Sequence, residues 1–267
     1  MRRLLSEQVE TRLMTNSQIM PGAEPMTHDG SGTTGVLVLH GFTGNPSSMR
    51  GLAESMAELG HHVEMPRLPG HGTTVEEMME TDWADWSGEV AAAHERLASR
   101  VDNVVVMGLS MGGSLTLWAA MNLPDIAGIV CINPATMPQP PEVLEMMREM
   151  VADGNAVVPG IGSDIADPDI VETAYDGTPL VPLLSFMDDG LAPMTGRFGD
   201  LAMPLLLITS RQDHVVEPAN SEHLAESYGG DVEHVWLERS YHVATQDFDR
   251  DDINKRAGEF VAQVTRG

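Results

Sequence analysis

One short stretch carries most of the fold information: Val104-Val-Val-Met-Gly-Leu-Ser-Met-Gly-Gly-Ser-Leu-Thr-Leu-Trp118. An apolar run, a Gly-x-Ser-x-Gly pentapeptide and a second apolar run follow one another, which predicts a strand, a sharp turn and a helix. Gly108 and Gly112 flank the serine because two backbones come together at so tight a reversal. The sequence therefore predicts that Ser110 presents its hydroxyl above the edge of a sheet as a nucleophile.

Short apolar runs alternate with helix-length segments along the rest of the chain. This alternation predicts an α/β fold, with a mainly parallel sheet and helices on both of its faces. The predicted strands are residues 36–40, 104–108, 129–133, 205–210 and 235–237, and the predicted helices are residues 49–59, 85–98, 114–121, 219–228 and 251–264.

The chain has 267 residues, of which 42% are hydrophobic, and this suffices for one domain with a full core. Residues 1–34 end in a polar, glycine-containing stretch and are predicted to form an N-terminal extension, with the catalytic domain at 35–267. Between about 134 and 200 the alternation gives way to prolines, aspartates and methionines, with one helical run at 141–151. We interpret this segment as a cap over the carboxyl edge of the sheet, where open α/β folds bind ligands.

The charge balance excludes several partners. Acidic residues outnumber basic ones by 40 to 15, which makes binding to nucleic acid or anionic lipid unfavourable and fits either a high-salt surface or an ordinary acidic protein. No apolar run is long enough for a membrane span, and acids at Glu7 and Glu10 interrupt the start, so we expect a cytoplasmic protein without integral membrane association. The single cysteine, Cys131, lies in an apolar run and is predicted to be a buried, inert thiol.

A serine nucleophile needs a base to take its proton and an acid to orient that base. Asp213 follows the predicted strand at 205–210, and His242 follows the one at 235–237, so both lie at the same sheet edge as Ser110. Taken singly, Asp213 could be a turn residue and His242 an ordinary loop histidine. Their order after the serine favours a triad of Ser110, Asp213 and His242, whereas His214 is poorly placed because it adjoins the orienting acid.

The oxyanion of the reaction needs two backbone N–H donors. The first candidate is the amide of Met111, directly after the nucleophile at the start of a helix. The second is the amide of Phe42, in the glycine-flanked turn after the strand at 36–40. The alternative is that this turn has no function.

Five motifs together resemble those of the bacterial monoacylglycerol lipases and related carboxylesterases of the α/β-hydrolase superfamily, from about residue 35 to 260. They are His40-Gly-Phe-Thr-Gly44, Pro66-Arg-Leu-Pro-Gly-His-Gly72, Gly108-Leu-Ser-Met-Gly-Gly113, Asp213-His-Val-Val216 and Ser240-Tyr-His-Val-Ala-Thr245. The resemblance implies the same triad and the same two oxyanion amides.

The predicted cap contains Ile161-Gly-Ser-Asp-Ile-Ala-Asp-Pro-Asp-Ile-Val-Glu-Thr-Ala-Tyr175, which also resembles the lipase family. The resemblance implies that Glu172 contacts the glycerol head group and that Ile161 lies along the acyl chain. A carboxylate can accept hydrogen bonds from two hydroxyls, so such a site favours substrates that keep both of them free. The alternative is that Glu172 is a solvated helix residue. Residues 137–159 depart from the family pattern.

These patterns predict a serine hydrolase that cleaves carboxylic esters, in particular monoacylglycerols, to an alcohol and a fatty acid through an acyl-enzyme. We expect no cofactor and no metal, and a small ester as the binding partner. One alternative is a general carboxylesterase or acyltransferase of short to medium chain preference without selectivity for glycerol. Another is a ligand-binding protein that keeps the fold without turnover.

Overall fold

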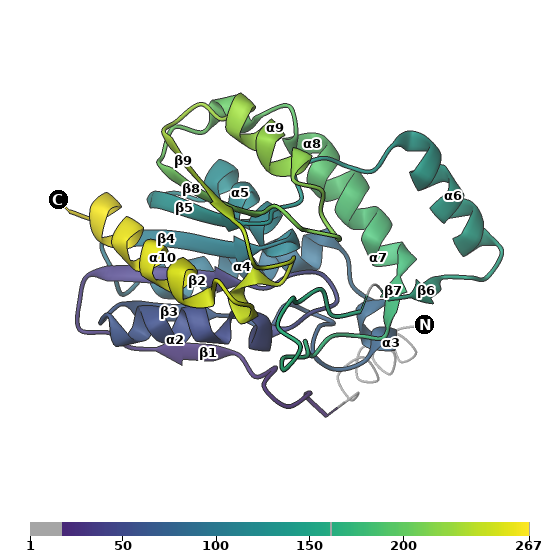
Figure 1. The fold of residues 1–267 in the computed structure, drawn as a ribbon, viewed down its shortest axis with the longest axis horizontal. Coiled ribbons are helices and arrows are strands. Elements are labelled where there is room, and N and C mark those ends of the chain that lie inside the picture. The colour runs from purple at the N-terminus through teal and green to yellow at the C-terminus, as the bar shows by residue number, and fades with distance from the viewer. Residues whose placement is uncertain (1–17, 161, 267) are drawn as a thin grey trace, which may run out of the picture.

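A seven-stranded sheet runs through the computed structural model, which describes residues 18–160 and 162–266 (Figure 1). The strand order is β1-β3-β2-β4-β5-β8-β9, and neighbouring strands are parallel except for β1 with β3. The α/β fold with a mainly parallel sheet is therefore confirmed. The strands are β1 (Met26–His28), β2 (Thr34–Leu39), β3 (His62–Met65), β4 (Asn103–Leu109), β5 (Ile126–Ile132), β8 (Leu205–Ser210) and β9 (Val232–Leu237).

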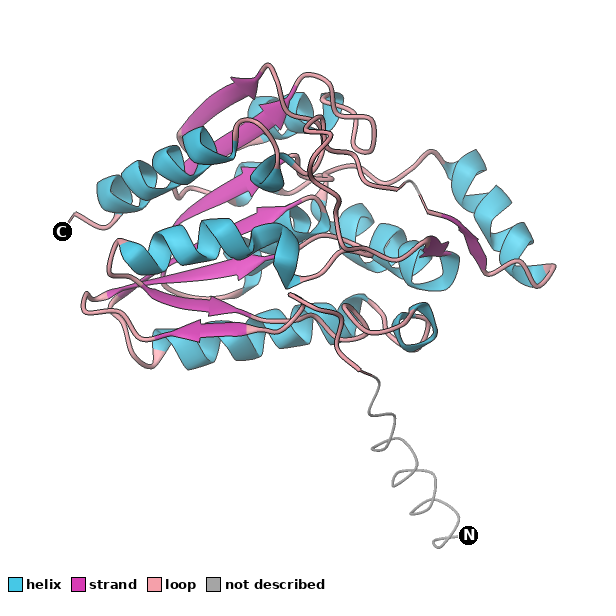
Figure 2. Ribbon diagram, turned by 60° about the horizontal axis from the view of Figure 1, so that its bottom comes forward, coloured by secondary structure: helices cyan, strands magenta, loops and turns pink. Residues whose placement is uncertain are grey.

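The central strands have continuous apolar sequences because helices cover both faces of the sheet. Helices α2 and α10 contact each other on one face, whereas α4 and α5 contact each other on the opposite face, where α9 packs beside β8 (Figures 1 and 2). Two separate apolar clusters result, one on each side of the sheet. The helices are α2 (Arg50–Glu58), α3 (Val75–Met78), α4 (Trp83–Ala98), α5 (Met111–Asn122), α9 (Ala219–Ser227) and α10 (Arg250–Val264).

The described part of the predicted N-terminal extension lies on the sheet. Strand β1 pairs antiparallel with β3, with Met26 opposite Met65, and the Met20 N–H donates to the Gly72 carbonyl at 2.9 Å. The sequence pattern did not predict this strand, because three residues are too few to show an alternation. The part of the extension before residue 18 lies outside the described residues.

Between β5 and β8 the chain leaves the sheet and lies beyond the carboxyl ends of its strands, to the right in Figure 1. A second helical region follows the predicted helix there. The sequence analysis missed it because Pro182, Gly190 and Pro193 are typical helix breakers. Pro182 lies in the first turn, where a missing N–H is harmless, and Pro193 follows a wider π-helical turn. The elements are α6 (Pro141–Ala152), β6 (Val157–Pro159), β7 (Gly177–Pro179), α7 (Leu180–Ser185), η2 (Phe186–Leu191) and α8 (Ala192–Met194).

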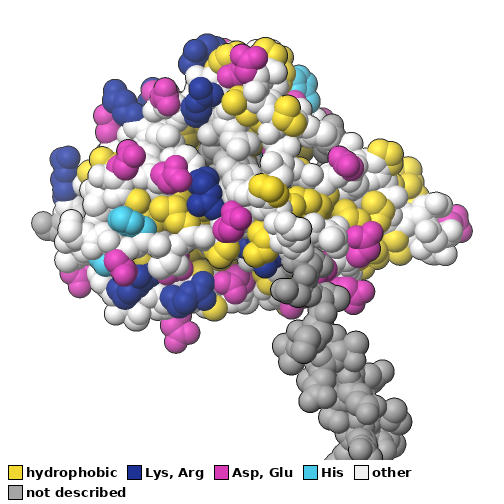
Figure 3. All heavy atoms as spheres, turned by 90° about the horizontal axis from the view of Figure 1, so that it is seen from below, with side chains coloured by type: hydrophobic (Ala, Val, Ile, Leu, Met, Phe, Trp, Pro, Cys, Tyr) yellow, Lys and Arg dark blue, Asp and Glu magenta, His cyan; other side chains and the backbone are white. Residues whose placement is uncertain are grey.

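This segment, residues 133–204, is called the cap below. Figure 3 shows hydrophobic side chains gathered toward the cap end of the molecule, with acidic and basic side chains mixed over the rest of that face. Exposed apolar residues of the cap include Met146, Val157 and Val181. None of the described helices is long and apolar enough to cross a bilayer.

Cys131 lies inside the sheet, on β5, with no exposed surface. Burial raises the pKa of its thiol, since a thiolate is disfavoured in an apolar interior. The predicted burial of this cysteine is confirmed, and its inertness stays a prediction.

Candidate active site

Ser110 lies alone between β4 and α5, in a backbone conformation that few residues adopt. Its φ is 58° and its ψ is −121°, and β4 ends one residue before it while α5 begins one residue after it. The flanking glycines are required by space. A Cβ on Gly108 would overlap the carbonyl of Gly112, and a Cβ on Gly112 would overlap the carbonyl of Leu39. The predicted turn is therefore present, and its reason is the close approach of three backbone segments.

Hydrogen bonds fix this turn from both sides. The Ser110 N–H donates to the Ile132 carbonyl at 3.0 Å, which ties the serine to the end of β5. The Ser110 carbonyl accepts the N–H of Ser114 at 3.2 Å, which is the first bond of α5. A sparsely populated conformation of this kind persists only where its surroundings fix it.

Asp213 and His242 form a buried pair at the ends of β8 and β9. Asp213 Oδ2 lies 2.8 Å from His242 Nδ1, and the two side chains are 1% and 8% exposed. The other oxygen, Oδ1, accepts the N–H groups of Val215 and Val216 at 2.9 and 2.8 Å. Asp213 Oδ1 accepts two N–H groups, and its remaining oxygen, Oδ2, accepts a hydrogen bond from the Nδ1–H of His242. The imidazole therefore carries its proton on Nδ1 and leaves Nε2 free to act as a base.

The loop that carries His242 is held by carboxylates along its length. Asp249 accepts the N–H groups of Arg239 and Ser240 at 3.2 and 3.0 Å, and Asp247 accepts the N–H of Tyr241 at 2.8 Å. Hydrogen bonds to ionised acceptors are stronger than neutral ones. Three successive amides before His242 therefore have fixed positions.

The backbone of His242 itself is held by two further side chains. Asp164 of the cap accepts its N–H at 3.0 Å, and Asn133, at the end of β5, donates from Nδ2 to its carbonyl at 2.7 Å. Asn133 also bonds Ser210 through its side-chain oxygen, so it joins the ends of β5 and β8 to this loop. The sequence analysis assigned no function to Asp164 or Asn133.

The two residues that carry the predicted oxyanion donors belong to segments next to Ser110. Met111 is the first residue of α5, and Phe42 follows Gly41, whose Cβ would lie 3.2 Å from the Cβ of Ser110. His40 supports this turn: its Nδ1 is 3.0 Å from the Gly41 carbonyl, and its Nε2 accepts the N–H of Leu68 at 3.1 Å. Burial, with a further contribution from His71, lowers the pKa of His40, so its imidazole is neutral.

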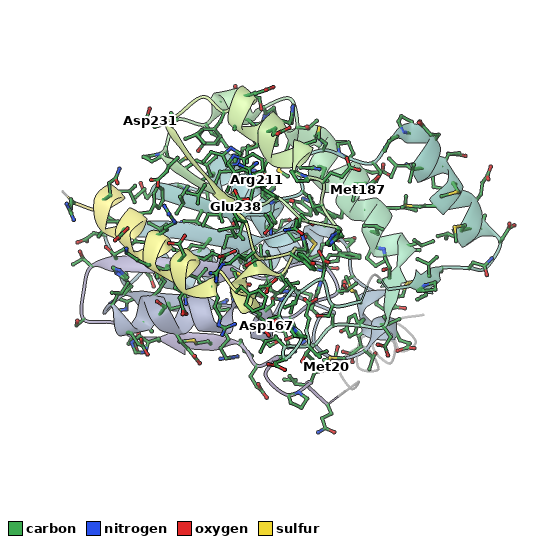
Figure 4. All side chains as sticks on the ribbon, viewed as in Figure 1. Met20, Asp167, Met187, Arg211, Asp231 and Glu238 are labelled. Atoms are coloured by element: carbon green, nitrogen blue, oxygen red, sulfur yellow. The ribbon has the colours of Figure 1, made fainter. Side chains whose placement is uncertain are left out.

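A cavity of about 800 Å³ connects these groups, and both Ser110 and His242 line it. In the described part of the chain, the side chains of Ser110 and His242 are not hydrogen-bonded to each other, and such bonds often form only with substrate bound. The cap supplies most of the apolar wall, including Met187, which Figure 4 labels beside α7. The apolar lining from the cap includes Met137, Pro138, Pro140, Met147, Val158, Leu180, Leu183, Phe186 and Met187.

The polar lining of the cavity is acidic. Asp164, Glu172 and Glu217 lie in it, whereas none of the described lining residues is a lysine or an arginine. Glu172 is half-buried, and its carboxylate makes no hydrogen bond within residues 18–160 and 162–266. Burial raises the pKa of this carboxyl group; His242 opposes the rise and Asp164 adds to it. The cavity thus joins Glu172 to Ser110 and His242, whereas Ile161, the other predicted substrate contact, lies outside the described residues.

His214, which the sequence analysis set aside as a base, also lines the cavity. Its Nδ1 lies 2.8 Å from Asp164 Oδ1, and its ring packs edge-on against Tyr241 with the centroids 4.6 Å apart. Among the residues that the structure describes, no group of three or more His, Cys, Asp and Glu side chains is arranged to hold a metal ion.

A parallel sheet with a strained serine at a strand-to-helix turn, followed by an acid and a histidine on later strand ends, defines an α/β hydrolase. The chain belongs to the family described as serine aminopeptidase, S33, whose model matches residues 33–249.

The known proteins that the chain resembles include a monoacylglycerol lipase and a carboxylesterase. The chain is 40% identical over 248 residues to the thermostable monoacylglycerol lipase of Bacillus sp. strain H-257, which covers 92% of this chain and 96% of that protein. It is 28% identical over 246 residues to a carboxylesterase of Bacillus subtilis strain 168, covering 90% and 97%. A solved structure from a study of the metagenome-derived lipolytic enzymes LipS and LipT is 43% identical, with a TM-score of 0.86, and covers 92% of this chain and all of that one.

Proposed function

We propose that the protein is a serine hydrolase that cleaves carboxylic esters, and that its preferred substrates are monoacylglycerols. The observation that carries this proposal is the shape and chemistry of one cavity. An apolar cap wall and an uncompensated carboxylate, Glu172, lie in the same cavity as Ser110 and His242. The 40% identity to a monoacylglycerol lipase supports the same substrate class.

The proposed reaction follows from the geometry of the three side chains. Ser110 Oγ attacks the ester carbonyl while His242 Nε2 takes its proton, and Asp213 stabilises the imidazolium that forms. The amides of Phe42 and Met111 hold the oxyanion. The imidazolium then protonates the leaving alcohol, which leaves an acyl-enzyme on Ser110. His242 next activates a water molecule, which releases the fatty acid and restores the serine.

The apolar end of the cavity suits an acyl chain. Its volume of about 800 Å³ lies within the range of about 300 to 1,000 Å³ of ligand pockets. Three methionines, at 137, 147 and 187, contribute to its wall. Unbranched methionine side chains repack around chains of different length, so we expect a broad rather than a sharp chain-length preference.

The head-group contact is the finer part of the proposal. Glu172 has acceptor capacity that no described side chain uses, and the two free hydroxyls of a monoacylglycerol are donors that match it. A diacylglycerol or triacylglycerol lacks one or both of these donors and would leave the half-buried carboxylate without a partner. Ile161 is proposed to lie along the acyl chain on the resemblance alone.

A general carboxylesterase is the second candidate, because a relative that covers 90% of the chain has that name. The test is Glu172→Gln, assayed on a 1-monoacylglycerol and on a p-nitrophenyl ester of the same acyl length. Loss of one charge-assisted hydrogen bond costs about 1.5 to 3 kcal/mol, so kcat/KM for the monoacylglycerol should fall about 10- to 100-fold while that for the p-nitrophenyl ester changes little.

Glu217→Gln is the matched control, since it removes the same charge from an exposed position on the same cavity. Glu217→Gln should change kcat/KM for the two substrates by the same factor. An equal effect of Glu172→Gln on both substrates would favour the general carboxylesterase.

The cytoplasmic location that the acidic N-terminal sequence favours stays a prediction.

A further inference from the structure

One cap residue, Asp164, contacts both loops that carry the proposed acid and base. Its Oδ2 accepts the N–H of His242 at 3.0 Å and the N–H of His214 at 3.2 Å, and its Oδ1 lies 2.8 Å from His214 Nδ1. Its main-chain carbonyl accepts the N–H of Val243 at 3.1 Å. The Asp164 side chain is 12% exposed and its bond to the His242 N–H is partly buried, whereas the His214 ring is 58% exposed.

Among the described residues, no carboxylate other than Asp164 accepts the main-chain N–H of His242. Asp249 and Asp247 hold the amides of residues 239 to 241 and therefore stop one residue short of the histidine. Within the described residues, the His242 N–H donates to Asp164 alone. The backbone position of His242, and with it that of the imidazole ring, thus depends on a residue of the cap.

The cap loop around Asp164 is itself anchored beside the histidine loop. Asp247 accepts the N–H groups of Ala166 and Asp167 at 2.7 and 3.0 Å with the same carboxylate that holds Tyr241. One carboxylate therefore bonds both segments, which fixes Asp164 relative to the residues before His242. The cap loop that carries Asp164 therefore cannot move away without breaking hydrogen bonds to the loop that carries His242.

We propose that Asp164 is a positioning residue for His242, which sets the backbone of the base without contacting the reacting atoms. The proposal rests on the proposed function in that it takes His242 as the base. The N–H of Glu172 donates to Ser163 Oγ at 3.1 Å, so the segment that positions the base also carries the proposed head-group contact. Displacement of a catalytic group by about 1 Å costs about 10²-fold in rate, and this sets the expected effect.

The test compares Asp164→Ala with Asp164→Asn. An asparagine keeps a carbonyl oxygen for the two N–H groups and an amide for the ring of His214, so it preserves the positions and removes only the charge. For Asp164→Ala we expect kcat to fall about 10- to 100-fold on both a monoacylglycerol and a p-nitrophenyl ester, with KM within about threefold. Labelling of Ser110 by a fluorophosphonate should slow in parallel. Asp164→Asn should restore kcat to within about threefold to fivefold of the wild type.

Asp167→Ala is the matched control. Asp167, labelled in Figure 4, lies on the same loop and is 15% exposed, but it does not line the cavity. Its carboxylate lies 3.6 Å from Arg250 and accepts the Asp169 N–H at 3.1 Å. Its kcat should stay within about twofold of the wild type. If circular dichroism shows that Asp164→Ala is unfolded, Asp164→Ser replaces it, since a short hydroxyl cannot reach both amides.

Three results would overturn the positioning proposal: a kcat of Asp164→Ala equal to that of Asp167→Ala, an effect on KM alone, or an asparagine variant as impaired as the alanine variant. Failure of the proposed function gives a different pattern. Turnover by Ser110→Ala would refute the assignment of the triad. Equal rates on monoacylglycerols and simple esters would refute the substrate preference, but the effect of Asp164→Ala on kcat would still be measurable.

Discussion

The backbone of Ser110 gives a stability prediction that is independent of any activity assay. Its φ of 58° and ψ of −121° disfavour every residue with a Cβ, whereas glycine adopts positive φ freely. Ser110→Ala keeps the Cβ and the strain, and Ser110→Gly removes both. Neither variant has a nucleophile, so a comparison between the two isolates the conformational cost of the turn.

The size of the effect follows from two opposing contributions. A residue held in a sparsely populated region costs about 1 to 3 kcal/mol, and Ser110→Gly recovers this. Glycine loses more conformational freedom on folding than alanine, which costs about 0.5 to 1 kcal/mol. The net gain of the glycine variant over the alanine variant is therefore about 0 to 2.5 kcal/mol, with a midpoint of about 1.3 kcal/mol. At about 2 to 4 °C per kcal/mol for a domain of this size, its Tm should be higher by about 3 to 5 °C at that midpoint.

Differential scanning calorimetry of the two variants, with urea unfolding at 25 °C, provides the measurement. Ala120→Gly is the control, because Ala120 lies within the regular part of α5, where glycine should lower stability by about 0.5 to 1 kcal/mol. Opposite signs at positions 110 and 120 are expected. If Ser110→Gly melts at or below Ser110→Ala, the strained turn does not have the cost that its dihedral angles imply.

Two further predictions concern charge. Asp164, Glu172 and Glu217 line the cavity, and none of its described lining residues is a lysine or an arginine. An acylglycerol phosphate should therefore be hydrolysed at least about tenfold more slowly than the monoacylglycerol of equal chain length, and added salt should reduce this difference in rate. Equal rates of hydrolysis in low salt would contradict this prediction. The folded state raises the pKa of Glu172 above its unfolded value of about 4.3. The wild type should therefore lose stability relative to Glu172→Gln as the pH rises from about 4.3 through that raised pKa. Below about pH 4 the difference in stability between the two proteins should be constant. Thermal melts of both proteins from pH 3.5 to about 8 measure this, and a Tm difference independent of pH would refute it.

The sequence predicted the sheet well because its central strands are buried on both faces. Residues 205–210 were predicted as a strand and form β8 with those bounds, and the other predicted strands differ from the observed ones only at their ends. Continuous valine, isoleucine and leucine runs give this signal. The cap was harder, since α7 and α8 contain prolines and the β6–β7 hairpin has only three residues in each strand. Tertiary packing stabilises these elements, and a local pattern does not reveal it.

The candidate site was predictable where its residues follow strands. Ser110, Asp213 and His242 each lie just past a strand end, which a sequence marks clearly. Asp164 has no such mark, because its partner His242 is 78 residues away and the bond joins a side chain to a backbone amide. Asn133 does directly follow β5, but its bond to the His242 carbonyl spans 109 residues, so its partner is not evident from the sequence. Supporting residues of this kind become visible only when the loops are placed in space.

The separation of the cap from the strand ends has an evolutionary consequence. The proposed chemistry comes from residues at the ends of β4, β8 and β9, whereas most of the apolar cavity wall comes from one uninterrupted stretch, residues 133–204. A gene could therefore acquire a new acyl-chain preference by exchange of a single internal segment. The bond from Asp164 to the His242 amide limits which segments are acceptable. A transplanted cap that lacks a hydrogen-bond acceptor at the position of Asp164 would change the pocket but leave the His242 amide without a partner.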